Sequence, residues 1–473
     1  QDPGPGSVIR PGGERGFVTV DGRRVLIRRY GRGPAVFVIH GSPQSSRAVE
    51  AVCQTLAARG LTAIAPDTPG AGASDPLPLA DPDSADFAAA LHRLTGTLGL
   101  SRVGLYGFHT GAATAATFAA LFPQNTAALV CDGLPAWTET ERARFLADYL
   151  TPFEPRWDGS HMAWLWARME AQTVFFPWHS TAPAERMSMA VSSPEQIHAN
   201  AMDLLAAGDG YRPVYRAAFT FRAEAVVDRL PSTALVACAA SDVLAAHLDR
   251  PALAGRGLIL PDIPNLHAAA ADHLAAHPGE PAPDHLAGGF LALGDDRLAI
   301  HRLSEGPGCP LVMLHDAGGS AADLTAPTDR PVIALDLPGH GLSAEGWHGP
   351  VDWPWTVRTA LNALNLSDAE VSGVGAGSVL ASALSGAEPV PCRVLGVPNP
   401  PPKLSPEWDG AHLIRAFRIA SWEQLFDPWY RRDPAHLIHR PSHLSAAHAR
   451  AVSLLLAQQR WSDLETWAAQ NAP

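Results

Sequence analysis

Short runs of apolar residues, each followed by a glycine-rich turn and then a helix-forming stretch, recur along this chain. One run, residues 35–39 (AVFVI), is continuous rather than alternating, which is typical of a parallel strand buried on both faces. Upstream, two strand-like segments flank Asp21-Gly22, a turn signal for a hairpin. Strands that alternate with helices in this way predict an α/β fold with a doubly wound, mostly parallel sheet.

The same pattern begins again in the second half of the chain, which predicts a tandem duplication. Four segments of the first half, which include apolar runs, glycine-rich turns and an aromatic segment, have counterparts in the second half, in the same order. The matched residues are His40 with His315, Asp67 with Asp336, Gly107 with Gly373, and Trp157 with Trp408.

The two repeats differ in length, because the second stops where its helical segment would return to the sheet. We therefore expect the second repeat to be truncated and to lack the last two strands. The Pro/Gly-rich start of the chain has no apolar signal region and is expected to be a flexible leader. The expected divisions are a leader at 1–14, a first domain at 15–280 with a cap at about 134–229, and a second domain at 289–473 with a cap-like segment at about 399–473.

Composition excludes several classes of protein. Of the 473 residues, 47% are hydrophobic and 17% charged, so a full core is expected rather than disorder. The net charge of −12 argues against nucleic acid and anionic membranes as partners, because both attract basic patches. No apolar run reaches the roughly 20 residues that span a bilayer. Five widely spaced cysteines are expected to be free thiols in a reducing compartment, so we expect a cytoplasmic protein.

The segment Gly107-Phe108-His109-Thr110-Gly111 follows an apolar strand and precedes a helix of small residues. This is the setting of the G-x-S-x-G nucleophile elbow, a strained turn between strand and helix. Together with residues 40–43 (HGSP) and 67–75 (DTPGAGASD) upstream, it makes the chain resemble the α/β-hydrolase superfamily. The similarity is to the branch of haloalkane dehalogenases, epoxide hydrolases and carbon–carbon bond hydrolases. It covers the first repeat and, in shortened form, the second.

The resemblance implies a set of site residues in the first domain. The catalytic acid corresponds to Asp242, with Asp132 at the other position that the family permits, and the terminal histidine corresponds to His267. The backbone N–H groups of Ser42 and Thr110 correspond to the oxyanion donors. The nucleophile position corresponds to His109, where serine, aspartate or cysteine is the rule.

The second domain departs further from the family pattern. Gly375 stands at its nucleophile position, Asp316 replaces the glycine after its strand-end histidine, and the acid and terminal histidine are absent. We therefore expect the second domain to be catalytically inactive.

Four hypotheses for His109 remain open from the sequence. His109 and His267 can move protons together, with Asp242 fixing the tautomer of His267, because an imidazole titrates near neutral pH. His109 can instead be a nucleophile that forms an acyl-imidazole. A third hypothesis is a metal site of two imidazoles and a carboxylate, although we expect no metal and no cofactor. The fourth is an inactive pseudohydrolase that binds a ligand or acts as a scaffold.

An aromatic segment in the cap suggests what contacts the substrate. Several rings recur at helical spacing, which places them on one face that either packs on the core or covers an apolar pocket. His40 is expected to be structural more than catalytic, although it adjoins the site. The candidate substrate-binding residues are His40, Phe108, Trp157, His161, Trp164 and Trp178.

The sequence thus favours a cofactor-free hydrolase that acts on an ester, lactone, thioester or carbon–carbon bond of an apolar small molecule. The alternatives are a lyase of the retro-aldol type, which would use the same proton-transfer groups, and the inactive pseudohydrolase. A truncated sheet exposes a parallel edge that a soluble protein must cover. We therefore expect the second domain to bury this edge against the first domain or against a second chain, and we favour a homodimer with the second domain in the interface. Binding of a separate partner by the second domain is the alternative.

Overall fold

The computed structural model describes residues 13–187, 190–283, 289–294, 296–327, 329–344, 347, 350–386, 402–438 and 461–471. The expected leader therefore lies almost entirely outside the described residues. The chain divides into two compact units, and each is described here by itself. The first unit comprises residues 1–154 and 167–288, and the second comprises residues 155–166 and 289–473.

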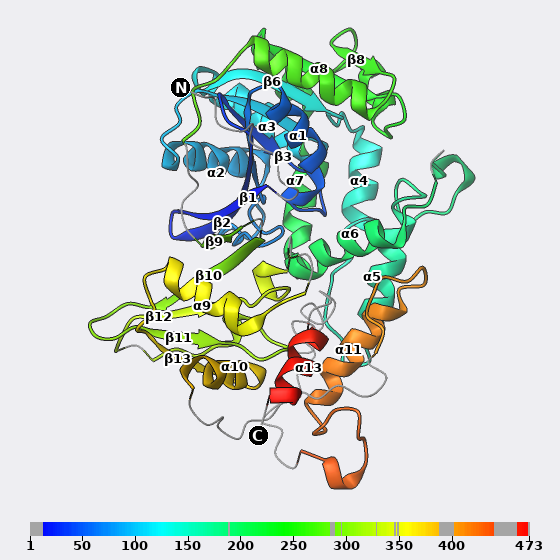
Figure 1. Cartoon of the computed structure of the whole chain (residues 1–473). Coiled ribbons are helices and arrows are strands. Elements are labelled where there is room, and N and C mark those ends of the chain that lie inside the picture. Colours follow the sequence, from blue (N-terminus) through cyan, green and yellow to red (C-terminus); the bar gives the residue numbers. More distant parts are fainter. Residues whose placement is uncertain are drawn as a thin grey trace. The chain divides into compact units, whose positions relative to one another are not determined.

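The first unit is built on an eight-stranded sheet of order β1-β2-β4-β3-β5-β6-β7-β8 (Figure 1). The pairs β1–β2 and β2–β4 are antiparallel and all later pairs are parallel, which confirms the predicted fold class. The strands are β1 (Glu14–Val20), β2 (Arg23–Tyr30), β3 (Ala35–Ile39), β4 (Thr62–Pro66), β5 (Val103–Phe108), β6 (Thr126–Asp132), β7 (Ala234–Ala239) and β8 (Gly257–Leu260).

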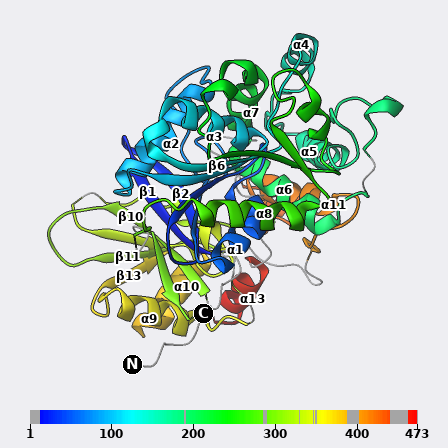
Figure 2. The same cartoon turned by 90° about the horizontal axis from the view of Figure 1, so that it is seen from above.

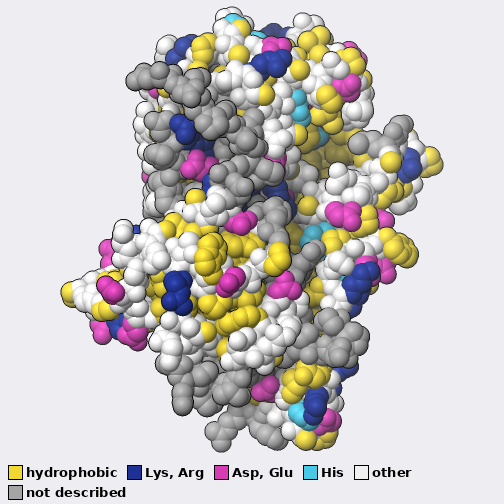
Figure 3. All heavy atoms as spheres, in the orientation of Figure 1, with side chains coloured by type: hydrophobic (Ala, Val, Ile, Leu, Met, Phe, Trp, Pro, Cys, Tyr) yellow, Lys and Arg dark blue, Asp and Glu magenta, His cyan; other side chains and the backbone are white. Residues whose placement is uncertain are grey.

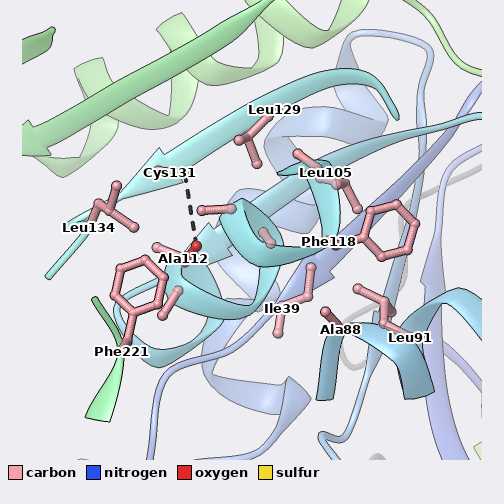
Figure 4. Close-up of a cluster of buried hydrophobic side chains, with 14 of the residues drawn as sticks. Ile39, Ala88, Leu91, Leu105, Ala112, Phe118, Leu129, Cys131, Leu134 and Phe221 are labelled. Atoms are coloured by element: carbon pink, nitrogen blue, oxygen red, sulfur yellow. Dashed lines mark hydrogen bonds between the residues drawn. The ribbon is translucent and has the colours of Figure 1, made fainter. Parts of the chain in front are cut away.

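Helices cover both faces of this sheet, which explains why its central strands are apolar throughout. One face carries α1 (Glu50–Ala58) and α8 (Ile263–Ala276), and the other carries α2 (Ser84–Thr97), α3 (Thr110–Leu121) and α7 (Tyr211–Thr220). Small residues on α3 let this helix pack closely on the sheet. Figure 4 shows part of that core, where the Cys131 thiol of β6 lies 3.9 Å from the Ala112 carbonyl oxygen of α3.

The segment between β6 and β7 forms the helices of the predicted cap. Apart from α7, these are α4 (Glu139–Asp148), α5 (Ser160–Ala171) and α6 (Pro194–Ala207). The boundary between the two compact units falls inside α5, since residues 155–166 belong to the second unit. No helix among the described residues is long and apolar enough to cross a membrane.

The second unit repeats the strand arrangement of the first five strands. Its sheet has the order β9-β10-β12-β11-β13, and as in the first sheet the β9–β10 and β10–β12 pairs are antiparallel and the others parallel. Hydrophobic side chains gather on its face over α9 (Trp353–Ala363), where Trp355 is 59% exposed (Figure 3). The remaining elements are β9 (Phe290–Leu293), β10 (Asp296–Ser304), β11 (Leu311–Leu314), β12 (Val332–Leu335), β13 (Glu370–Gly373), α10 (Ala376–Ser385), α11 (Ala411–Glu423) and α13 (Trp461–Asn471).

The histidines matched between the repeats make the same hydrogen bonds. His40 Nδ1 lies 2.7 Å from its neighbour's carbonyl oxygen, and its Nε2 accepts the Thr68 N–H at 2.9 Å. In the second unit, His315 Nδ1 lies 2.6 Å from the next carbonyl oxygen and its Nε2 accepts the Leu337 N–H at 2.9 Å. Each imidazole therefore links two strand ends, and both ring nitrogens of His40 contact backbone groups.

The matched aspartates also bind equivalent loops. Asp67 accepts hydrogen bonds from the Ser46 and Ala73 N–H groups at 2.8 and 2.9 Å. Asp336 accepts from Ala321 and Leu342 at 2.7 and 2.8 Å. Both carboxylates are 1% exposed. Asp67 thus joins the loop after β3 to the turn after β4, and Asp336 joins the loop after β11 to the turn after β12.

We expect Asp67→Ala to lower the free energy of unfolding by about 3 kcal/mol, because it leaves one buried and one partly buried N–H donor without an acceptor. The measurement is chemical denaturation of the full chain. Asp81→Ala, at a carboxylate that is 70% exposed, is the control and should change stability by no more than about 0.5 kcal/mol. Equal effects of the two substitutions would contradict a structural role for Asp67.

Candidate active site

His109 occupies a strained turn between β5 and α3, as the elbow motif predicts. Its backbone angles are φ 50° and ψ −105°, a conformation that L-residues seldom adopt. Strand and helix approach so closely here that a Cβ on Gly107 would lie 2.2 Å from the Gly111 carbonyl oxygen. A Cβ on Gly111 would lie 2.1 Å from the carbonyl oxygen of Ile39. The two glycines thus permit the turn that projects His109 from the carboxyl edge of the sheet.

The imidazole of His109 is held by a carboxylate from the loop after β7. His109 Nε2 lies 2.8 Å from Asp242 Oδ2, and the two side chains are 29% and 13% exposed. The ring also stacks on Phe108, with 4.0 Å between ring centroids. Gly133, at φ 66°, makes room for the ring, because a Cβ there would lie 2.5 Å from His109 Cδ2. These contacts fix the ring position on three sides.

The pairing shifts the pKa values of both partners. Burial lowers the pKa of the His109 imidazole, but the charge and hydrogen bond of Asp242 raise it by more, so the net shift is upward from 6.5. Burial raises the pKa of Asp242, but His109 lowers it by more, so the net shift is downward from 3.8. The pair therefore favours an ionised carboxylate beside an imidazole that binds its proton more tightly than usual.

Asp132, the other candidate acid, has a different environment. Its Oδ2 accepts the Tyr106 hydroxyl proton at 2.5 Å, and it is 5% exposed at the end of β6. Burial raises the pKa of Asp132 to about 6, although the Tyr106 hydrogen bond and the His109 charge oppose this shift. The site thus places two carboxyl groups near one imidazole, and only Asp242 bonds to it.

His267 does not join this pair, contrary to the expectation that Asp242 would orient it. His267 lies inside α8, where its ring meets Tyr106 edge-on at 6.4 Å between centroids, and burial lowers its pKa. The hydrogen bonds among the described residues include none from His267 to His109 or Asp242. The reason is local, since Asp262 caps α8 by accepting the Asn265 N–H at 2.8 Å. The helix therefore starts right after β8 and carries the histidine with it.

The two predicted oxyanion donors are Ser42, in the loop after β3, and Thr110, the first residue of α3. Within the described part of the chain, no hydrogen-bond acceptor is found for the backbone N–H of Ser42 or of Thr110. The equivalent donors of the second unit are Ala317 and Ala376. Both donate to Oδ1 of Asp316 at 2.8 Å. In the second unit one carboxylate oxygen thus accepts hydrogen bonds from both N–H groups of this pair. That oxygen belongs to the side chain of Asp316.

Gly375 explains why the second unit lacks a side chain at its elbow. Its φ is 52°, close to that of His109, so the turn itself is the same. A Cβ at this position would lie 2.0 Å from Asp316 Cγ. The internal carboxylate and an elbow side chain therefore exclude each other.

The remaining candidate residues are spread over both units. Trp178 donates its Nε1–H to the Tyr149 carbonyl oxygen at 3.3 Å and lies 4.7 Å from the Arg168 guanidinium, which is a packing role. Trp157, His161 and Trp164 belong to the second compact unit and not to the unit of His109. Among the described residues, no cluster of three or more His, Cys, Asp or Glu side chains is arranged to hold a metal ion.

An open cavity of about 380 Å³ lies beside the loop that carries Asp242. Ala240, Ser241 and Val243, which flank that aspartate, form one wall. The cap forms the opposite wall with a mixture of apolar and charged side chains, namely Phe176, Ala184, Glu185, Arg186 and Met187. The cavity therefore offers a small ligand access to the residues next to the imidazole–carboxylate pair.

Sequence reasoning missed three residues that shape this site. Tyr106 and Gly133 contact Asp132 and His109 as described above. His247 is buried, its Nδ1 accepts the Ala136 N–H at 3.0 Å, and burial lowers its pKa to about 4. Of these three residues only Gly133 left a signal in the sequence, because a glycine directly after the strand-end residue Asp132 indicates a turn with a positive φ.

Comparisons with known proteins agree with the topology. The family model described as alpha/beta hydrolase fold matches residues 34–275. Uncharacterised proteins of Mycobacterium tuberculosis and Mycobacterium bovis are 41% identical over 108 residues. That match spans 23% of this chain and only 31% of those relatives.

Two solved structures are similar over 56% of this chain. Epoxide hydrolase A from Mycobacterium thermoresistibile is 17% identical, with a TM-score of 0.46 and 99% of its length covered. A bromoperoxidase from Bacillus anthracis is 18% identical, with a TM-score of 0.42 and 97% of its length covered.

We expect Asp242→Asn to lower the pKa of His109, because burial is then opposed only by the weaker effect of the Asp132 charge. NMR titration of the imidazole resonances measures this change. The raised pKa of His109 stabilises the fold below pH 6.5 and this contribution is lost as pH rises through the folded-state value. The lowered pKa of Asp242 stabilises the fold above pH 3.8 and this contribution is lost as pH falls through the folded-state value.

The stability difference between wild type and Asp242→Asn should therefore be largest between pH 3.8 and 6.5. Asp228→Asn, at a side chain that is 75% exposed, serves as the control. An unchanged His109 pKa in Asp242→Asn would show that the two side chains do not interact in solution.

In the second unit, we expect Gly375→Ala to be destabilising by about 3 kcal/mol, since the new Cβ collides with Asp316 at a positive φ. In an Asp316→Gly background the same substitution should cost only about 1 kcal/mol, the strain of the turn alone. A double-mutant cycle from denaturant unfolding measures the difference. Additive effects would mean that the carboxylate does not occupy the elbow.

Proposed function

Since the chain belongs to the α/β-hydrolase fold family, we propose that its first unit is a hydrolase that uses His109 as a general base. The proposal rests on one observation above all. An imidazole bonded to a carboxylate projects from the elbow turn, and the N–H of the next residue, Thr110, has no acceptor among the described residues. Base and oxyanion donors are the two elements that hydrolysis of an acyl bond requires.

The geometry assigns the two ring nitrogens of His109 to different tasks. With Asp242 ionised, Nε2 carries the proton that the carboxylate accepts, and Nδ1 keeps a lone pair. Nδ1 removes a proton from a water molecule as the water oxygen attacks the substrate carbonyl carbon. Asp242 stabilises the imidazolium that forms, which is the role of the acid in a serine-containing triad.

The remaining steps follow from the donors at the turn. The N–H groups of Ser42 and Thr110 would receive the negative charge of the tetrahedral oxygen, each contributing about 3 kcal/mol to stabilisation of the transition state. The imidazolium of His109 then returns its proton to the leaving oxygen or sulfur as that bond breaks. The products are a carboxylic acid and an alcohol or thiol. Esters, lactones and thioesters fit this scheme, because their leaving groups need only one proton.

The cavity beside Asp242 favours a small substrate with an apolar portion. Phe176, Met187 and Val243 contribute apolar surface. Glu185 and Arg186 lie on the cap side of the same cavity and give it a polar rim. A substrate that presents its acyl group toward the elbow would leave its apolar part against the cap.

A second candidate function is the binding of a carboxylate ligand without turnover. It is favoured by Asp316, whose carboxylate oxygen occupies the equivalent pair of N–H groups in the second unit. In the first unit, the raised pKa of His109 would place a positive charge next to a bound carboxylate below that pKa. The two functions differ in whether water is activated.

We expect the full chain to hydrolyse short-chain p-nitrophenyl esters or thioesters, and His109→Ala to reduce kcat/KM at least 100-fold. His267→Ala is the matched control and should retain activity within about threefold, since that residue lies outside the pair. The rate should rise with pH through a midpoint above 6.5, because only neutral His109 acts as a base and its pKa is raised.

Isothermal titration with acetate or butyrate distinguishes the second candidate. Equal esterase activity in wild type and His109→Ala would contradict the hydrolase proposal. If His109→Ala also weakens carboxylate binding, the second candidate, binding without turnover, is supported. Equal activity and no binding in both proteins would contradict both candidates.

A further inference from the structure

Two similar turns precede α5 and α11, and both lie in the second compact unit. The sequences are PRWDGSH at residues 155–161 and PEWDGAH at residues 406–412. In each turn the histidine Nδ1 accepts a backbone N–H five residues upstream, at 3.1 Å for His161 and 3.2 Å for His412. The N-terminal half of α5 lies beside α11 (Figures 1 and 2).

The contacts between these two helices are reciprocal. The ring of His161 meets Phe417 edge-on at 4.6 Å and 85°. The ring of His412 meets Trp166 edge-on at 5.1 Å and 89°. Each partner ring stands five positions after the histidine of its own helix. His161 of α5 therefore contacts α11 at the position equivalent to the one at which His412 of α11 contacts α5.

The glycines of the two turns obey the same reciprocity. Gly159 and Gly410 have φ of 78° and 70°. A Cβ on Gly159 would lie 3.0 Å from Phe417 Cδ1, and a Cβ on Gly410 would lie 2.3 Å from Trp166 Cγ. Each turn therefore needs glycine for its backbone and also because the ring of the other helix lies against it.

Hydrogen bonds across the pair follow the same arrangement, with one change. Trp166 donates its Nε1–H to the Trp408 carbonyl oxygen at 3.2 Å. Phe417 has no donor, and its neighbour Arg418 instead donates to the Asp158 carbonyl oxygen at 2.9 Å. Each helix thus donates one bond to the turn that begins the other. All four rings at the centre are buried, with exposures of 5% or less: His161, Trp166, His412 and Phe417.

Reciprocal contact of equivalent residues is the signature of a two-fold, isologous interface, in which residue i meets j and j meets i. Packing of unrelated helices gives no reason for it. We propose that the chain is a tandem duplication in which the cap helices pair as they would in a homodimer of single-repeat proteins. The second repeat then serves as the built-in partner of residues 155–166, a role that requires no catalysis.

The tests use the full chain and hydrogen exchange measured by mass spectrometry. We expect Gly410→Ala to accelerate amide exchange at least tenfold in both 160–166 and 411–423, because the added methyl group displaces Trp166. Gly159→Ala should accelerate exchange in the same two segments through Phe417. Gly386→Ala is the matched control, since Gly386 has φ of 68° in the same unit but no atom within 4 Å of a Cβ. It should affect only its own segment.

Acceleration confined to the helix that carries the substitution would overturn the proposal. If Gly410→Ala unfolds the whole unit, which faster exchange in β11 and β12 would reveal, a volume-conserving exchange keeps the proposal testable. The double variant Trp166→Phe/Phe417→Trp exchanges the two rings. The indole then lies on the side of Gly159 and His161, and the phenyl ring lies on the side of Gly410 and His412. We expect exchange rates in both helices within about threefold of wild type. Loss of protection in both helices of this folded variant would show that the two sides are not equivalent.

Discussion

The close approach of β5 and α3 is the constraint on which the rest of the first unit depends. The turn at residue 109 is possible only because Gly107 and Gly111 present no side chains to each other or to the end of β3. The strained conformation projects one side chain outward and leaves the first N–H of α3 without a helical acceptor. The outward position of the residue-109 side chain and the first N–H of α3 therefore come from the same piece of backbone geometry, whichever residue occupies the turn.

Electrostatics then determine what that residue can do. In a serine-containing relative, the acid and the general base act on a hydroxyl group at the elbow. In this chain the elbow residue is itself an imidazole, and the acid bonds to it directly. Asp132 is kept apart by its bond to Tyr106, and burial raises its pKa to about 6. The carboxyl group beside the ring thus ionises more readily than usual, while the other keeps its proton up to about pH 6.

Much of the fold followed from pattern, because buried parallel strands and glycine-rich turns leave strong local signals. The turn at His109 was predicted in this way, whereas Asp242 was proposed as the acid from the family resemblance and lies 2.8 Å from the His109 ring. His267 was misplaced because its distance from β8 fits a loop histidine, whereas the cap at Asp262 starts α8 early. The Asp316 carboxylate at the donor pair and the reciprocal helix contacts depend on residues far apart in sequence. No local pattern encodes such contacts.

The nucleophile position of each elbow, His109 in one unit and Gly375 in the other, bears neither a hydroxyl nor a thiol group. Fluorophosphonate reagents, which capture hydrolases by bonding to a serine oxygen at this turn, would meet a carboxylate-bound imidazole in one unit and a bare glycine in the other. Proteins with this arrangement would be missed by surveys that count hydrolases through covalent labelling. Their detection depends instead on following the disappearance of substrate.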